Sequence, residues 1–166
     1  KMYDVILTES SHIWACSSLF TQEFYEIVKK RLNPGGIYAI WLPYYEMDSE
    51  DFAIIMNTIT SVFGHITEFD FGNDIILLAS DHELRFPDGV LLQKLDDPLV
   101  RKSFSSVKEI EEEDDLSDLT FLQKHYIPDV KAYISANFAN ITAMHTDDLP
   151  ILEFRTLRHM YDKFSG

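Results

Sequence analysis

Tyr3-Asp-Val-Ile-Leu-Thr8 opens an alternating pattern of strand and helix signals. The run is short, apolar and β-branched, which is typical of a strand covered on both faces. Ser17 to Leu32 predicts a helix, because its apolar residues form one stripe and its acidic and basic residues match the helix dipole. Asn33-Pro-Gly-Gly36 predicts a stop and a turn. Ile37-Tyr-Ala-Ile-Trp-Leu42 predicts the next strand.

The pattern continues with one more helix and a hairpin. Asp48 or Ser49 can cap a helix whose apolar side runs to Phe63. The segments 65–71 and 74–80 have strand character and are joined across Gly72 and Asn73, which is a hairpin signal. Strand, helix, strand, helix and hairpin in this order predict an α/β layered fold with an antiparallel edge.

The sequence changes character after Asp81, so we predict two parts, residues 1–80 and 81–166. Short helices are expected at 89–95 and 98–107, and the acidic run 109–115 reads as a solvated turn or helix start. One helix is expected to carry Leu116 to Tyr126, and Pro128 is expected to open another. The second part is therefore predicted to be mostly helical.

Composition and charge exclude several classes of protein. The chain has 166 residues, 46% hydrophobic and 25% charged, which suits an ordinary globular domain. Its net charge of −14 argues against nucleic acid and anionic lipid as partners, because both require clustered Lys and Arg. A cationic substrate such as a polyamine is attracted to such a chain, although net charge says little about a specific ligand.

The cellular setting is predicted from absences in the sequence. The single cysteine, Cys16, cannot form an internal disulfide and suits a reducing compartment. No apolar run approaches the roughly 20 residues of a membrane span, and no signal peptide precedes the first strand. We expect a cytoplasmic protein, or the cytoplasmic part of a membrane protein, and a chain that is a fragment of something longer.

Two segments that follow strands could carry chemistry, because ligands of open α/β sheets bind beyond the carboxyl ends of the strands. After the first strand, Glu9 could be a general base and His12 could share a proton with it. The end of the second strand supplies Trp41-Leu-Pro-Tyr-Tyr-Glu-Met47, where Tyr44, Tyr45 and Glu46 could line a pocket. The alternative is a polar surface loop beside core aromatics.

The remaining patterns are weaker. His145 with Asp147 and Asp148 lacks the spacing of a metal site, and a turn before Pro150 is the better interpretation, so we predict no metal. The glycines after Pro34 follow a helix rather than a strand, so they do not form a phosphate-binding loop.

Several of these segments resemble the spermidine synthase (polyamine aminopropyltransferase) family, in particular the carboxyl-terminal part of bacterial spermidine-synthase-like proteins. The likeness rests on the segments 3–11, 19–28, 32–36 and 41–47, and on the late motif Thr146-Asp-Asp-Leu-Pro-Ile-Leu-Glu-Phe154. It covers residues 2 to about 80 well, and then the late motif.

The resemblance implies the carboxyl half of a Rossmann-like S-adenosylmethionine-dependent methyltransferase fold with a helical C-terminal extension. It implies aminopropyl transfer from decarboxylated S-adenosylmethionine to an amine acceptor. The residues that bind this co-substrate are expected upstream, so we expect no cofactor on this chain alone and an inactive fragment. By position, Glu9 corresponds to the catalytic carboxylate, and His12, Trp14, Tyr44 and Tyr45 are assigned to the acceptor side.

The chain departs from the family pattern Asp-Ser-Ser-Asp-Pro in three places. Glu9 replaces the first Asp, His12 the second and Ile13 the Pro. A neutral imidazole offers one acceptor and an imidazolium none, so polyamine specificity is in question. Two other functions therefore stay open: a non-catalytic regulatory or assembly domain, and a methyltransferase that uses intact S-adenosylmethionine. We also expect self-association through the edge of the first strand.

Overall fold

The computed structural model describes residues 1–84, 94, 97–105, 124–128 and 130–164. The chain divides into two compact units, one formed by Lys1–Leu84 and Tyr126–Gly166 and the other by Arg85–His125. The second unit contains helix α4 (Pro98–Ser105). The predicted helix at 89–95 and the acidic run 109–115 fall almost wholly outside the described residues, and the division predicted at residue 80 stays a prediction.

Five strands form one mixed sheet in the part of the first unit that is described. They are β1 (Tyr3–Glu9), β2 (Leu32–Pro43), β3 (His65–Asp70), β4 (Asp74–Ser80) and β5 (Tyr126–Ile127), in the spatial order β1-β2-β4-β3-β5. β1 and β2 are parallel, whereas the other three neighbouring pairs are antiparallel. The predicted α/β class with an antiparallel hairpin is confirmed, and β1 is an edge strand.

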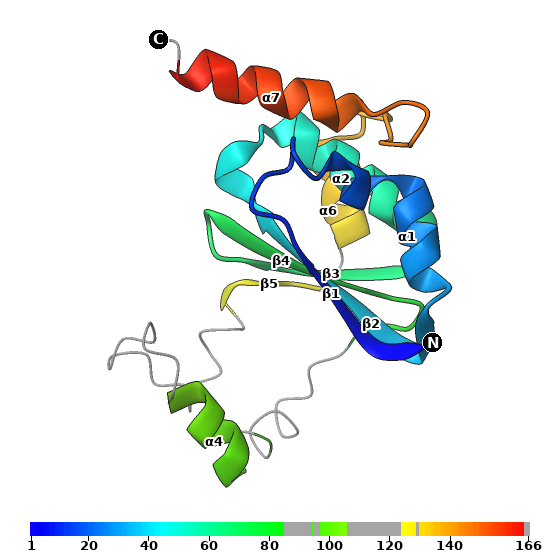
Figure 1. Cartoon of the computed structure of the whole chain (residues 1–166), viewed down its shortest axis with the longest axis vertical. Coiled ribbons are helices and arrows are strands. Elements are labelled where there is room, and N and C mark those ends of the chain that lie inside the picture. Colours follow the sequence, from blue (N-terminus) through cyan, green and yellow to red (C-terminus); the bar gives the residue numbers. More distant parts are fainter. Residues whose placement is uncertain (85–93, 95–96, 106–123, 129, 165–166) are drawn as a thin grey trace. The chain divides into compact units, whose positions relative to one another are not determined.

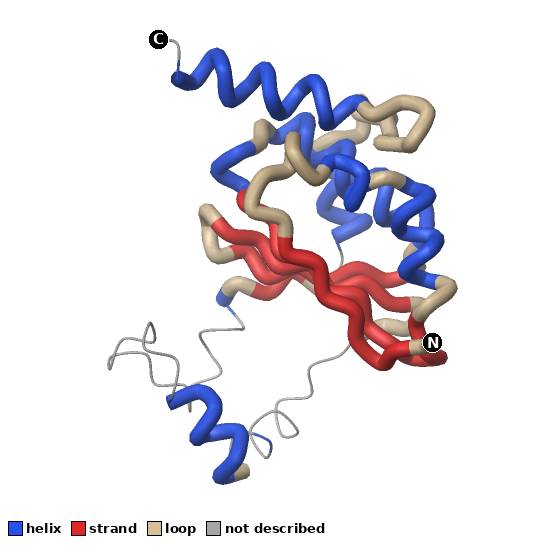
Figure 2. The backbone as a smooth tube through the Cα atoms, viewed as in Figure 1, coloured by secondary structure: helices blue, strands red, loops and turns tan. Residues whose placement is uncertain are grey.

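The helices of this unit lie on one side of the sheet (Figures 1 and 2). They are η1 (Ser17–Phe20), α1 (Gln22–Lys29), η2 (Tyr44–Glu46), α2 (Ser49–Val62), α6 (Val130–Asn137) and α7 (Ile151–Phe164). α2 begins where the sequence predicts, because Asp48 and Asp51 form a reciprocal capping box. None of the described helices is both long and apolar enough to cross a bilayer.

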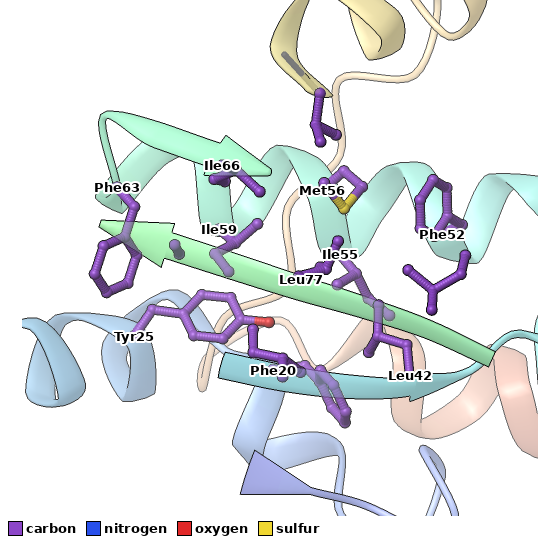
Figure 3. Close-up of a cluster of buried hydrophobic side chains, with 14 of the residues drawn as sticks. Phe20, Tyr25, Leu42, Phe52, Ile55, Met56, Ile59, Phe63, Ile66 and Leu77 are labelled. Atoms are coloured by element: carbon purple, nitrogen blue, oxygen red, sulfur yellow. The ribbon is translucent and has the colours of Figure 1, made fainter. Parts of the chain in front are cut away.

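The core lies between the sheet and these helices (Figure 3). Alternate residues of β2 point into it: Tyr38, Ile40 and Leu42 are at most 1% exposed. α2 contributes the side chains that face them, namely Phe52, Ile55, Met56 and Ile59. α2 is thus the central helix of the layer, and it is apolar over much of its circumference because neighbours cover it on several sides.

The structure corrects three details of the predicted elements. The helix expected over 17–32 is broken at Thr21, whose hydroxyl accepts a hydrogen bond from the Phe24 amide and so caps α1. The Asn33–Gly36 segment is counted within β2, although Gly35 has a φ of 78° and the register shifts there. Tyr126, expected in a helix, pairs with Phe69 as part of β5.

Candidate functional site at the carboxyl ends of two parallel strands

The parallel pairing of β1 and β2 brings together two segments that are distant in the sequence. Their register ends with Glu9 beside Trp41, so both strands leave the sheet at the same edge. The loop 10–16 follows β1, and η2 follows β2. All five residues that the sequence assigns to the site therefore lie at or just beyond this edge, where ligands of open α/β sheets bind.

The contact that joins the two segments is between His12 and Glu46. His12 Nδ1 lies 2.7 Å from Glu46 Oε1, and the Ile13 amide donates to Glu46 Oε2 at 3.4 Å. The Glu46 side chain is 7% exposed, whereas that of His12 is 53% exposed. An ionised carboxylate only accepts hydrogen bonds, so Nδ1 of the imidazole donates and, in the neutral ring, Nε2 is left as an acceptor.

The loop after β1 is shaped by hydrogen bonds to the carbonyl oxygen of His12. The amides of Ala15 and Cys16 donate to it at 3.2 and 3.1 Å, and the Ser10 hydroxyl donates at 3.1 Å. Ile13 is fully buried and anchors the loop in the core. The sequence therefore builds a tight turn that holds His12 between a fixed backbone and a buried carboxylate.

The other four predicted site residues differ in their exposure and in their packing contacts. Glu9 is exposed at the end of β1. Trp14 stacks on the His12 ring with centroids 5.8 Å apart, and its Nε1 is buried without a hydrogen-bond partner among the described residues. Tyr44 packs edge-on against Phe52 of α2 at 5.5 Å, and Tyr45 is 48% exposed.

The structure gives His12 a different hydrogen-bond partner from the one that the sequence suggested. The imidazole bonds Glu46 rather than Glu9, and no hydrogen bond or ion pair joins Glu9 to His12 in the described part of the chain. The sequence marked Glu46 only as a possible pocket residue. The pairing of Glu46 with His12 depends on the alignment of β1 with β2, which the sequence does not show. The one local signal for this pairing is that Glu46 is an acidic residue shortly after the second strand.

The structure also shows a buried carboxylate that the sequence did not single out. Glu68 of β3 is 2% exposed, and its Oε2 has no hydrogen-bond partner among the described residues. Burial, and to a lesser degree the charge of Asp70, raises the pKa of Glu68 to about 7. Burial also raises the pKa of Tyr44, with further contributions from Tyr133 and the acidic groups nearby.

His145, the residue directly before the late motif, has a structural role. His145 is fully buried, its Nε2 lies 2.9 Å from the Ser17 carbonyl oxygen, and its Nδ1 accepts from the Leu152 amide at 3.3 Å. The His145 amide in turn donates to Thr58 Oγ1 at 2.9 Å. Burial lowers the pKa of His145, which keeps the ring neutral. His145 therefore links η1, α2 and the start of α7 through hydrogen bonds.

Two cavities lie away from this edge. One of about 440 Å³ is lined by Asn57 of α2, by Ile134 of α6 and by the segment after α6. Another of about 330 Å³ is lined by Lys29, Phe63, His82 and the start of β2. None of the five predicted site residues lines either cavity.

Comparison with known proteins finds similarity over part of the chain. No family model matches the chain. It is 29% identical over 73 residues to polyamine aminopropyltransferase 2 of Pseudomonas aeruginosa, which covers 42% of this chain and 21% of that protein. It is 30% identical over 70 residues to a polyamine aminopropyltransferase of Aeropyrum pernix, which covers 40% of this chain and 22% of that protein.

Among solved structures, a probable spermidine synthase from Corynebacterium glutamicum matches 49% of this chain and 32% of its own, with 21% identity and a TM-score of 0.38. The matched segment spans about a fifth of the length of the curated relatives. Over about two fifths of its length, the chain is distantly similar to the polyamine aminopropyltransferases.

Proposed function

We propose that this chain supplies the acceptor half of a spermidine-synthase-like transferase. The reaction moves an aminopropyl group from decarboxylated S-adenosylmethionine to an amine. The observation that carries the proposal is the meeting of two polar segments at one sheet edge, joined by the 2.7 Å hydrogen bond between His12 and Glu46. The distant similarity to polyamine aminopropyltransferases supports it.

The chemistry asks three things of such a site. It must hold a cationic acceptor, remove a proton to free the nitrogen lone pair, and align that lone pair with the sulfonium carbon. Glu9 and His12 are two exposed side chains here that can accept a proton. Trp14, Tyr44 and Tyr45 offer aromatic surface that attracts an ammonium group. We assign none of the described residues to the nucleoside of the donor, and the fold we propose is the carboxyl half of the methyltransferase-like sheet.

The test is a transfer assay on the native polypeptide that carries these residues. It is incubated with decarboxylated S-adenosylmethionine and a series of mono- and diamines, and methylthioadenosine release is measured together with the alkylated amine. We expect amine-dependent release. The Glu9→Gln/His12→Asn double variant is expected to lower it by roughly 100-fold or more, because both groups that can accept the proton are gone.

Binding of methylthioadenosine, measured by calorimetry on the same polypeptide, separates the other functions. One outcome is that the polypeptide binds methylthioadenosine and does not transfer the aminopropyl group. If it then transfers a methyl group from intact S-adenosylmethionine, the result would favour a methyltransferase. A folded polypeptide that neither binds the nucleoside nor transfers would contradict the proposal and favour a non-catalytic regulatory or assembly domain.

A further inference from the structure

We propose that His12, oriented by Glu46, is the general base of this site, and that Glu9 holds the cationic end of the acceptor. The inference rests on the proposed function and deepens it. It exchanges the roles that position in the sequence assigned to Glu9 and His12. The inference is based on the carboxylates of Glu9 and Glu46 and on the imidazole of His12. These three groups differ in burial and in their hydrogen-bond partners.

Glu46 is buried and is placed to orient a base. It is 6% exposed, and each of its oxygens already accepts a hydrogen bond, from His12 Nδ1 at 2.7 Å and from the Ile13 amide at 3.4 Å. The buried Glu46 carboxylate thus faces the His12 ring and the loop backbone rather than solvent. Its remaining effect is to fix one imidazole tautomer and to stabilise the imidazolium that forms when the ring takes a proton.

His12 has the opposite properties. Its side chain is 53% exposed, and no hydrogen bond occupies Nε2 within the described residues. Glu46 is the charged group that the described structure places against the ring, and the other neighbours, Ile13 and Trp14, carry no charge. The ring is therefore held on one side by Nδ1 and presents a basic nitrogen on the other.

Glu9 is exposed, and its carboxylate has no hydrogen bond or ion pair within the described part of the chain. Nothing fixes the orientation of this carboxylate as Glu46 fixes that of the His12 ring. A carboxylate is also a weaker base than an imidazole and is less suited to take a proton from an ammonium group near neutral pH. Its full negative charge suits it to bind that ammonium instead.

In the proposed step, proton transfer to His12 precedes the formation of the new bond. His12 Nε2 takes one proton from the acceptor ammonium and becomes an imidazolium paired with Glu46. The freed nitrogen lone pair forms the new N–C bond while the C–S bond of the sulfonium breaks, and sulfur keeps the bonding pair as a neutral thioether. The alkylated amine leaves as a secondary ammonium, and the exposed imidazolium returns its proton to solvent.

The first test needs no activity and uses this chain. Long-range proton–nitrogen NMR of the histidine rings reports which nitrogen carries the proton above about pH 8, where an imidazole is neutral. We expect His12 to be protonated at Nδ1, and this preference to be lost in the Glu46→Ala variant. Exposed His65 serves as the internal control and is expected to be unaffected by that substitution. Protonation of His12 at Nε2 overturns the inference.

The second test measures kcat and KM separately in the native polypeptide. His12→Asn is expected to lower kcat by roughly 100-fold or more with little change in KM, because the group that accepts the proton is gone. Glu46→Gln, which can still accept from Nδ1, is expected to lower kcat less. Glu9→Gln is expected to raise KM and keep kcat. His65→Asn, far along the sequence on β3, is the matched histidine control and is expected to change neither.

The outcomes separate this inference from the function on which it rests. No transfer by the unaltered polypeptide contradicts the proposed function, whatever tautomer NMR shows. Transfer that survives in both His12→Asn and His12→Gln, or a kcat that collapses in Glu9→Gln while KM stays constant, overturns the role of His12 and leaves the proposed function standing.

Discussion

Glu68 shows how one residue sets a pH dependence of stability. Its carboxyl is buried, one of its oxygens has no partner among the described residues, and its pKa is raised from 4.5 to about 7 by burial and then by Asp70. Between these two values the folded state binds more protons than the unfolded state. Stability therefore falls as pH rises through this interval, and the full penalty is present above about pH 7.

Replacing Glu68 by Gln removes the charge and hence the penalty. Above about pH 7 we expect the free energy of unfolding to rise by up to about 3 kcal/mol, since one pKa unit corresponds to about 1.4 kcal/mol. The gain should disappear toward about pH 4.5, and chemical denaturation at both pH values measures it. Glu153→Gln, an exposed carboxylate on α7, is the control. An equal effect of Glu68→Gln at both pH values would contradict this account.

At the scale of elements, one arginine fixes the position of α7. Arg155 donates through Nε to Asp51 Oδ1 at 2.7 Å, and its NH2 group lies 2.9 Å from Glu50 and 3.4 Å from Asp48. These carboxylates stand in or beside the first turn of α2, where the helix dipole also favours negative charge. Asp51 is 1% exposed, so Arg155 compensates a buried charge at the junction of the two helices.

We expect Arg155→Gln to destabilise the unit by about 1–2 kcal/mol, because the Asp51 carboxylate keeps its burial and loses its cationic partner. The same substitution should raise amide hydrogen exchange in α7 more than in α2, since α7 loses its attachment. Arg158→Gln provides the comparison on the same helix, because Arg158 is exposed. Equal exchange rates in the two variants would show that Arg155 does not hold the helix.

At the scale of the molecule, the sheet of the described unit has two unlike faces. The helices cover one of them (Figure 2). On β1, which is an edge strand, Tyr3, Val5 and Leu7 are 41%, 60% and 65% exposed. The strand expected to be covered on both faces is therefore open in this structure. An apolar edge strand with free backbone groups is a template for pairing with another chain.

We expect this chain to self-associate through β1. Light scattering should give a mass above that of the monomer, falling with dilution, and Val5→Lys should shift it to the monomer because a charge on an edge strand opposes pairing. Ile27→Lys, an exposed apolar position on α1, should leave the association unchanged. A monomer at all concentrations would refute the expectation.

Much of the fold could be predicted because its signals are local. The capping box of α2 lies within four residues, and the hairpin of β3 and β4 is marked by Gly72, which adopts a φ of 84°. The break of the first helix at Thr21 was missed because apolar periodicity continues across it. β5 was missed because a strand of two residues is too short to show an alternation of apolar and polar side chains. These residues form a strand only because they pair with β3.

The sequence alone determined two things, the α/β alternation and the position of Glu9, His12, Trp14, Tyr44 and Tyr45 at or just after the ends of their strands. Both follow from neighbours along the chain. Only the tertiary structure decided which groups meet. His12 and Glu46 are 34 residues apart, and they bond because β1 and β2 are parallel neighbours in register. Burial is also decided by the tertiary structure. It removes Glu46 and Glu68 from solvent, whereas Glu9 and His12 stay exposed.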